Sequence, residues 1–181
     1  MRTQVLIRVQ FLKYLLAPAI ALSMTTLPVM QTNADTPQEP TVRAAMIFNL
    51  LKFVKWPETL SADAPLRICL VEASADLTSA VQALDQRVAN THPLTARSVR
   101  ANDLSACEVI VTDSMQAPFA PDRLQARGVL TIGEANFIDR GGMIGIAVIA
   151  NRVRFEINNS AMQSAGIILP AQVLRLAVRT R

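Results

Sequence analysis

Apolar residues gather in short runs between polar turns along residues 41–181, and these runs predict alternating helices and strands. Continuous apolar runs are typical of strands buried on both faces, as in a parallel sheet covered by helices. The first helix is predicted over 41–55, with Thr41 as its cap and Trp56-Pro57 as its end. The other predicted helices are 76–84, 122–126, 160–165 and 172–179, and the predicted strands are 66–71, 92–100, 109–112 and 129–132.

Gly141-Gly142 interrupts this alternation. Two further strands, 143–150 and 152–158, are predicted after it and meet around Asn151, a residue type that tolerates the left-handed backbone of a tight hairpin. The predicted fold class is α/β, a three-layer sandwich with a mostly parallel central sheet plus a C-terminal β-hairpin.

Residues 1–34 have the pattern of a secretory signal peptide. A basic start precedes a short apolar stretch, and small residues then stand where a signal peptidase reads, which predicts cleavage after Ala34. An uncleaved anchor helix is the alternative, although Pro18 and Pro28 weaken the stretch as a membrane span.

Cleavage would leave a short lead-in at 35–40 and a single domain at 41–181 in the periplasm. The whole chain has a formal net charge of +4, but its basic leader contains no acidic residue, so the mature domain is almost neutral. No block of basic residues is interleaved with aromatic ones, so nucleic-acid binding has no support.

The sequence lacks the residue groups of common enzyme and cofactor sites. It has no Gly-x-Ser-x-Gly motif, and the turn after Val71 contains no glycine to cradle a phosphate. His92 is the single histidine, so a Cys/His zinc site cannot be assembled. We therefore predict a protein that is not an enzyme, with no catalytic residue, no metal and no cofactor.

Cys69 and Cys107 are the two cysteines, and export would place them in an oxidising compartment. One lies in a predicted strand and the other begins one, and βαβ connections could make those strands neighbours. Because the compartment is oxidising, we predict a disulfide between them. Two buried free thiols are the alternative, since free cysteine is a common core residue.

Phe48, Lys52 and Trp56 follow one another at i, i+4 spacing on the polar side of the first predicted helix. Phe53 is expected on the opposite, core-facing side. Each large aromatic ring left in water forgoes about 1.5–3 kcal/mol of burial free energy. The three residues are therefore a hypothetical partner-binding or self-association surface. The alternative is that another segment of the same chain, most simply the final helix, covers them.

Arg154, Glu156 and Asn158 alternate with apolar residues in the second strand of the predicted hairpin, so they share its polar face. One interpretation is a solvated face on which Asn158 turns the chain or caps the next helix. The other is a polar patch that holds a small ligand or a loop of a partner.

Several short motifs occur in order along the chain, namely Lys52-Phe53-Val54-Lys55-Trp56-Pro57, Leu66-Arg67-Ile68-Cys69-Leu70, Gly141-Gly142-Met143-Ile144 and Arg154-Phe155-Glu156-Ile157-Asn158. In this combination, which spans nearly the whole predicted domain, the chain resembles the YfiR family of periplasmic regulators. The resemblance implies a repressor that binds the periplasmic domain of an inner-membrane diguanylate cyclase of the YfiN type. Binding would lower cyclic di-GMP output and, with it, biofilm formation.

The resemblance also implies a homodimer and an outer-membrane lipoprotein that sequesters the regulator. Some relatives have a second cysteine pair in the hairpin region, whereas 143–158 contains none here, so any redox control would rest on Cys69 and Cys107. The alternative function is a periplasmic solute-binding sensor with a small polar pocket near Arg154 and Glu156.

Overall fold

The computed structural model describes residues 38–114, 120–125, 127–150 and 152–181. The predicted signal peptide and the first residues of the predicted lead-in lie outside this part of the chain. The elements are α1 (Glu39–Leu51), β1 (Leu66–Leu70), α2 (Ala75–Gln82), β2 (Val88–Ala89), β3 (His92–Ser98), β4 (Val109–Val111), α3 (Pro121–Gln125), β5 (Leu130–Glu134), the 3-10 helix η1 (Phe137–Arg140), β6 (Ile144–Ile149), β7 (Arg152–Ile157), α4 (Asn159–Ser164), α5 (Ala171–Leu174) and β8 (Arg179–Thr180).

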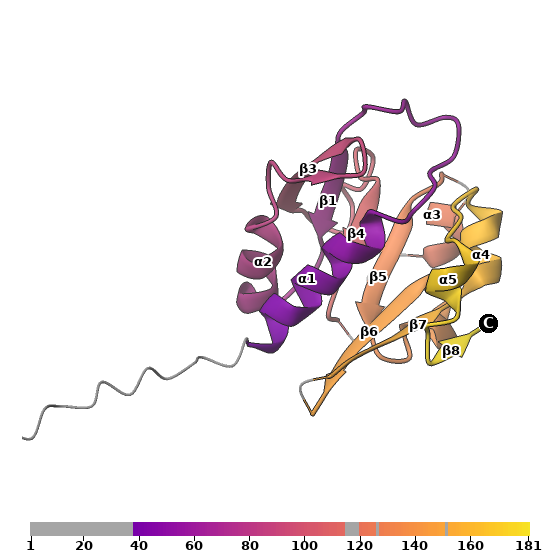
Figure 1. The fold of residues 1–181 in the computed structure, drawn as a ribbon. Helices are drawn as coiled ribbons and strands as arrows, with labels where there is room; N and C mark the ends of the chain where they lie inside the picture. The colour runs from indigo at the N-terminus through magenta and orange to yellow at the C-terminus, as the bar shows by residue number, and fades with distance from the viewer. Residues whose placement is uncertain (1–37, 115–119, 126, 151) are drawn as a thin grey trace, which may run out of the picture. The chain divides into compact units, whose positions relative to one another are not determined.

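The strands form one sheet in the order β2-β3-β1-β4-β5-β6-β7-β8 (Figure 1). β3, β1, β4, β5 and β6 are parallel to one another, and β7 returns antiparallel to β6 as a hairpin. Short edge strands complete the sheet, with β2 antiparallel to β3 and β8 parallel to β7. The predicted α/β class, mostly parallel sheet and C-terminal hairpin are confirmed.

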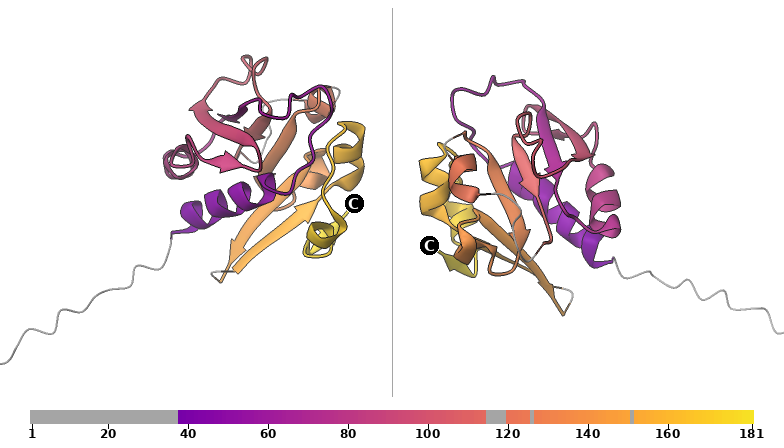
Figure 2. Two further views of the ribbon diagram at one scale, coloured as in Figure 1. Left: turned by 45° about the horizontal axis from the view of Figure 1, so that its top comes forward. Right: turned by 180° about the vertical axis from the view of Figure 1, so that it is seen from behind.

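Helices cover both faces of the sheet, and the alternation of side chains along β1 shows how. Leu66, Ile68 and Leu70 are buried in the larger core cluster together with side chains of α1 and α2. Cys69 points the other way, into a second cluster that includes Leu124 of α3. Figure 2 shows α1 and α2 on one side of the central strands and α3 on the other. The three layers predicted from the apolar runs are therefore present.

The first helix differs from its prediction at the start. It begins at Glu39, and Pro40 lies in its first turn, where a missing N–H removes no helical hydrogen bond. Gln38 is the N-cap and its side chain makes no capping bond, so the prediction that Thr41 caps this helix is wrong.

The same helix also ends earlier than predicted. Its last residue is Leu51 rather than Lys55, and the Phe53 N–H donates to the carbonyl of Leu50 in a tight turn. The chain is then extended as it approaches Trp56-Pro57, since the residue before proline avoids helical geometry. Phe53 consequently leaves the predicted core face and is 51% exposed.

The predicted helix over 172–179 is wrong beyond Leu174, where α5 ends. The Val178 N–H donates to the carbonyl of Phe155, and Arg179–Thr180 pairs with β7 as a strand. The chain between α5 and β8 forms turns, in which Leu176 and Val178 are exposed. The unpaired outer side of β7 offers this segment main-chain partners that a helix would not use.

β2 and η1 were not predicted. Asn90 makes the β2–β3 turn with a left-handed backbone (φ 58°). η1 lies between two more left-handed residues, Asn136 (φ 62°) and Gly141 (φ 86°). A Cβ at Gly142 would lie 2.1 Å from the ring of Phe137, so the Gly-Gly pair supplies first a left-handed turn and then room for a buried ring.

Candidate functional site

The segment that follows α1 pairs with the chain between α4 and α5, and each of the two segments exposes a large apolar side chain. Lys55 and Ile168 exchange two main-chain hydrogen bonds, at 2.8 and 3.0 Å between N and O. Side chains alternate on both segments, so Val54 and Ile167 point into the core. Phe53 and Ile168 stay 51% and 53% exposed. We call Phe53 and Ile168 the apolar patch, and Lys55 is the exposed charged residue next to it.

Phe48 and Lys52 come together near this patch, as the helical spacing predicted. The Lys52 ammonium lies 5.5 Å from the centre of the Phe48 ring. The Arg87 guanidinium lies over the same ring at 4.0 Å and comes from the turn before β2. Phe48 is half-buried and also packs against the larger core cluster. The predicted alternative was that the final helix covers Phe48. The two cations at the Phe48 ring come instead from Lys52 and Arg87.

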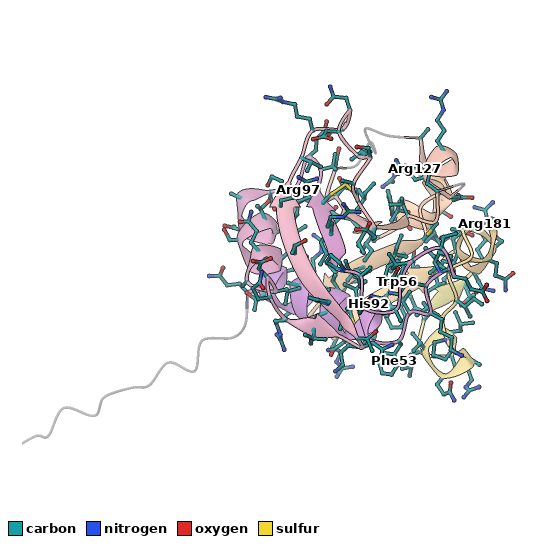
Figure 3. All side chains as sticks on the ribbon, turned by 90° about the horizontal axis from the view of Figure 1, so that it is seen from above. Phe53, Trp56, His92, Arg97, Arg127 and Arg181 are labelled. Carbon is teal, nitrogen blue, oxygen red and sulfur yellow. A yellow bond between two sulfur atoms is a disulfide. The ribbon has the colours of Figure 1, made fainter. Side chains whose placement is uncertain are left out.

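Trp56 does not join Phe48 and Lys52 in one helical stripe, because α1 has already ended. It is half-buried, and its ring meets His92 edge-on, with ring centres 6.4 Å apart (Figure 3). His92 is itself buried, and its Nδ1 lies 2.8 Å from the carbonyl oxygen of Ala64. The indole N–H of Trp56 is buried and has no hydrogen-bond partner among the described residues.

Pro57 fixes the position of this segment by packing against two glycines far away in sequence. A Cβ at Gly128 would lie 3.1 Å from Pro57 Cγ, and a Cβ at Gly166 would lie 3.2 Å from Pro57 Cβ. Both glycines have positive φ, 69° and 68°. The Trp-Pro motif therefore has a structural role, since its proline seats the loop against two left-handed turns.

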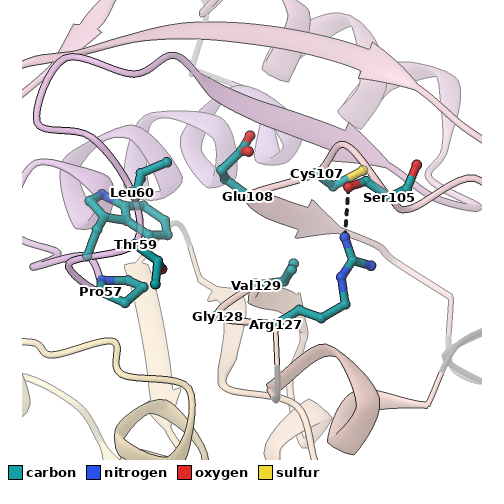
Figure 4. Close-up of a pocket in the computed structure, with 10 residues that line it drawn as sticks. Pro57, Thr59, Leu60, Ser105, Cys107, Glu108, Arg127, Gly128 and Val129 are labelled. Carbon is teal, nitrogen blue, oxygen red and sulfur yellow. Dashed lines mark hydrogen bonds between the residues drawn. The ribbon is translucent and has the colours of Figure 1, made fainter.

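A pocket of about 220 Å³ opens beside Trp56, at the amino ends of β4 and β5 (Figure 4). Three stretches of chain line it, from the loop after α1, the segment before β4 and the turn before β5. We call it the amino-edge pocket. Its lining residues are Trp56, Pro57, Thr59, Leu60, Ser105, Cys107, Glu108, Arg127, Gly128 and Val129.

Glu108 in this pocket is already neutralised. Arg67 donates to both of its carboxylate oxygens and also contributes its main-chain N–H at 2.9 Å. This hydrogen bonding raises the pKa of the Arg67 guanidinium. Arg127 donates instead to the carbonyl oxygens of Leu104, at 3.1 Å, and Ser105, at 2.8 Å. Among the described residues, no carboxylate pairs with Arg127.

A disulfide joins Cys69 of β1 to Cys107, which lies just before β4, with a sulfur–sulfur distance of 2.02 Å. The predicted bond is confirmed, and the alternative of two free thiols is excluded. The bond lies on the face of the sheet that α3 covers, within the smaller core cluster. It therefore fastens one wall of the amino-edge pocket to the central strand.

Arg154, Glu156 and Asn158 do not form a common pocket in the described structure. The Asn158 side chain caps α4 by accepting the N–H of Ala161 at 3.1 Å. Glu156 accepts from Arg179 at 2.9 Å, and Arg154 is exposed. The pocket of about 320 Å³ beside α4 is lined by Asn158 but by neither of the other two. The capping interpretation of Asn158 is thus the one that the contacts show.

The usual ligand position of such a sheet is between β1 and β4, where the strand order reverses. Ligands of open α/β sheets bind at the carboxyl ends of the strands at this point. Here both carboxylate oxygens of Asp113 accept the N–H of Ser74, at 3.1 and 3.0 Å, at the start of α2. The chain's own carboxylate therefore takes the place where an anionic ligand would meet the helix N-terminus.

Metal and membrane features are absent from the described residues. No group of three or more His, Cys, Asp or Glu side chains there could hold a metal ion. Within the same part of the chain, every helix is too short or too polar to cross a bilayer.

The fold and the surface together define a class, a small three-layer α/β domain with an exposed apolar patch beside its first helix. A family model described as YfiR/HmsC-like matches residues 40–178, and the chain therefore belongs to this family. The family is regulatory rather than catalytic, and membership supports a periplasmic regulator of diguanylate cyclase signalling. No curated protein matches the chain.

The sequence alone did not predict the apolar patch or the two charged residues of the pocket, Glu108 and Arg127. Phe53 could have been recognised from its place just before Trp56-Pro57, since a helix seldom continues up to a proline. Ile168, Glu108 and Arg127 carry no such local signal. They meet the loop after α1 only through the tertiary fold.

Proposed function

We propose that this protein binds the periplasmic domain of an inner-membrane diguanylate cyclase and represses it, which lowers cyclic di-GMP output. Family membership supports the pathway, and the apolar patch supports action through contact rather than catalysis. The proposal includes export by the signal peptide at 1–34 and a protein without catalytic activity of its own.

The single observation that carries this proposal is the exposure of two large apolar side chains, Phe53 and Ile168, on two segments that the Lys55–Ile168 bridge joins. Aromatic and aliphatic anchors of this kind dominate protein interfaces once a partner excludes water from them. Lys52 and Lys55 are exposed next to them. We therefore expect the partner surface to be apolar at its centre and acidic at its rim.

The test compares exposed apolar residues inside and outside the patch. Phe53→Asp and Ile168→Asp each place a charge in the proposed interface without opening the core. Ile149→Asp is the matched control, because Ile149 is 64% exposed at the tip of the β6–β7 hairpin. Each variant complements a deletion strain, and cyclic di-GMP is measured together with capture of the cyclase's periplasmic domain by the purified protein.

We expect the deletion to raise cyclic di-GMP, and the wild type and Ile149→Asp to restore the low level. The two patch variants should fail to restore it and should bind the cyclase at least tenfold more weakly. Phe48→Ala and Lys52→Ala should have smaller effects in the same direction, because Arg87 already covers the Phe48 ring. Unchanged cyclic di-GMP in the deletion strain, or equal loss with Ile149→Asp, contradicts the proposal.

The family resemblance extends the proposal to a homodimer and to an outer-membrane lipoprotein that competes with the cyclase. Sedimentation of the purified protein tests the first point, with a dimer expected at micromolar concentration. For the second, a captured outer-membrane lipoprotein should be displaced by the cyclase domain. Simultaneous binding of both partners would contradict competition.

A further inference from the structure

The amino-edge pocket is smaller than a site for a drug-sized ligand but large enough for a molecule of a few heavy atoms. Its volume is about 220 Å³, whereas sites for drug-sized ligands occupy about 300–1,000 Å³. Trp56, Pro57, Leu60 and Val129 give it an apolar side. The lining as a whole is more polar than apolar, so a ligand here would be small and would present a polar group as well as an apolar one.

The charges around the pocket favour an anion. Glu108 is neutralised by Arg67, which makes two side-chain hydrogen bonds to its carboxylate. Arg127 has carbonyl partners at Leu104 and Ser105 but no carboxylate partner within the described chain. Carbonyl oxygens orient a guanidinium without cancelling its charge, so an anion in this pocket would find one uncompensated cation.

We propose that the amino-edge pocket binds a small carboxylate, with its apolar part against Trp56 and its charge toward Arg127. Figure 4 shows Arg127 beside Ser105 on one side of the space. On the other side it shows Pro57, Thr59 and Leu60. A carboxylate suits this arrangement better than inorganic phosphate, because the apolar wall would leave part of a fully polar ion unsolvated. The site is separate from the apolar patch and does not depend on the proposed partner.

The chain contains its own reporter for the site. Trp56 is the single tryptophan, so intrinsic fluorescence reads the pocket wall directly. Butyrate is titrated into the full mature protein, with butyramide as its uncharged counterpart and inorganic phosphate as an anion without an apolar part. Calorimetry repeats each titration with a signal that is independent of fluorescence. We expect saturable binding of butyrate and at least tenfold weaker binding of butyramide and phosphate.

Thr59 offers a matched pair of variants, because it is exposed and lines the pocket without fixing the fold. Thr59→Glu introduces a competing carboxylate opposite Arg127 and should weaken butyrate at least tenfold. Thr59→Gln has nearly the same size and no charge and should stay within about twofold of the wild type. Arg127→Gln should also lose binding, whereas Arg123→Gln, at an exposed position of α3 outside the pocket lining, should not.

Thermal unfolding of each variant separates loss of binding from loss of folding. The proposal is overturned if butyrate gives no saturable signal in either measurement, if butyramide or phosphate binds as tightly as butyrate, or if folded Thr59→Glu binds like Thr59→Gln. None of these results bears on cyclase binding, which the patch variants test separately.

Discussion

The two edges of the parallel sheet use their side chains in opposite ways. At the carboxyl edge, between β1 and β4, Asp113 accepts the Ser74 N–H and completes the start of α2. At the amino edge, Arg127 donates to carbonyl oxygens beside an open pocket and pairs with no carboxylate among the described residues. The edge where such sheets usually bind ligands is occupied by the chain's own carboxylate, whereas at the opposite edge the Arg127 charge has no carboxylate partner within the described part of the chain.

This difference shows that the sheet order alone does not locate a site. The topological rule describes where helix N-termini and strand ends converge, but the residues there decide whether anything is left to bind. At the carboxyl edge, Asp113 already accepts the Ser74 N–H, so this group is no longer available to a ligand. At the amino edge, three loops that meet beside a disulfide leave a pocket open.

The largest effect on this comparison should come from the disulfide at the amino edge. Replacing Cys69 and Cys107 together by Ala should lower the free energy of unfolding by about 2–4 kcal/mol, because the bond closes a long loop in the unfolded chain. The two cysteines are separated by 38 positions. Urea unfolding of the oxidised protein, followed by circular dichroism, measures the change.

Wild-type protein in excess dithiothreitol is the control, and it should unfold at the midpoint of the double variant. A double variant within about 0.5 kcal/mol of the oxidised wild type would show that other contacts hold the pocket wall.

The next largest effect is expected at Gly128. Gly128→Ala should lower the free energy of unfolding by about 1–3 kcal/mol, because alanine resists a φ of 69° and its Cβ would press on Pro57. Trp56 fluorescence should shift in the folded variant, since Pro57 follows it directly. Gly141→Ala, at another left-handed position, isolates the backbone strain. An unchanged Trp56 spectrum in Gly128→Ala would argue against the seating role of Pro57.

At the carboxyl edge, Asp113→Asn should lower the free energy of unfolding by about 0.5–1 kcal/mol. Asparagine keeps one acceptor for the Ser74 N–H but loses the charge that favours the start of α2. Asp103→Asn, an exposed acid in a loop, is the matched control and should be nearly neutral. Chemical denaturation distinguishes the two, and equal values would mean that Asp113 does no more than an ordinary surface acid.

The smallest effect concerns pH. The Arg179 guanidinium, bonded to Asp139 at 2.7 Å, lowers the pKa of the Asp139 carboxyl. A lowered folded-state pKa gives stability that is present above the unfolded value of about 3.9 and is lost as pH falls through the folded value. Because both groups are exposed, the change should be slight. Urea midpoints between pH 6 and about pH 2 should fall less steeply in Arg179→Gln, and an identical slope would contradict the pairing.

Much of the fold could be predicted because its signals are local. Val109–Val111 and Leu130–Glu134 are short apolar runs between turns, and such runs identify buried strands without knowledge of their neighbours. The hairpin over β6 and β7 was predicted from two strands that meet around Asn151, and their antiparallel pairing is confirmed, whereas Asn151 itself lies outside the described residues. The disulfide was predicted from the oxidising compartment, and the pairing of β1 with β4 brings the two cysteines together.

The errors lie where tertiary pairing overrides local preference. The chain after Leu174 has helical composition, yet the free side of β7 recruits it as β8. Phe53 would lie on the core face of a longer helix. The helix ends at Leu51, however, and Lys55 pairs with Ile168 in a β-bridge. The pocket residues Glu108 and Arg127 stand on different loops, so no spacing along the chain relates them.

Pro57 lies against both Gly128 and Gly166, and these contacts link three positions of which the first and the last are 109 residues apart. Any side chain gained at either glycine would displace the proline, and a bulkier residue in its place would collide with both turns. Among relatives, these positions should therefore covary. Relatives without the proline should tolerate other residues at both glycine positions, and relatives with the proline should retain both glycines.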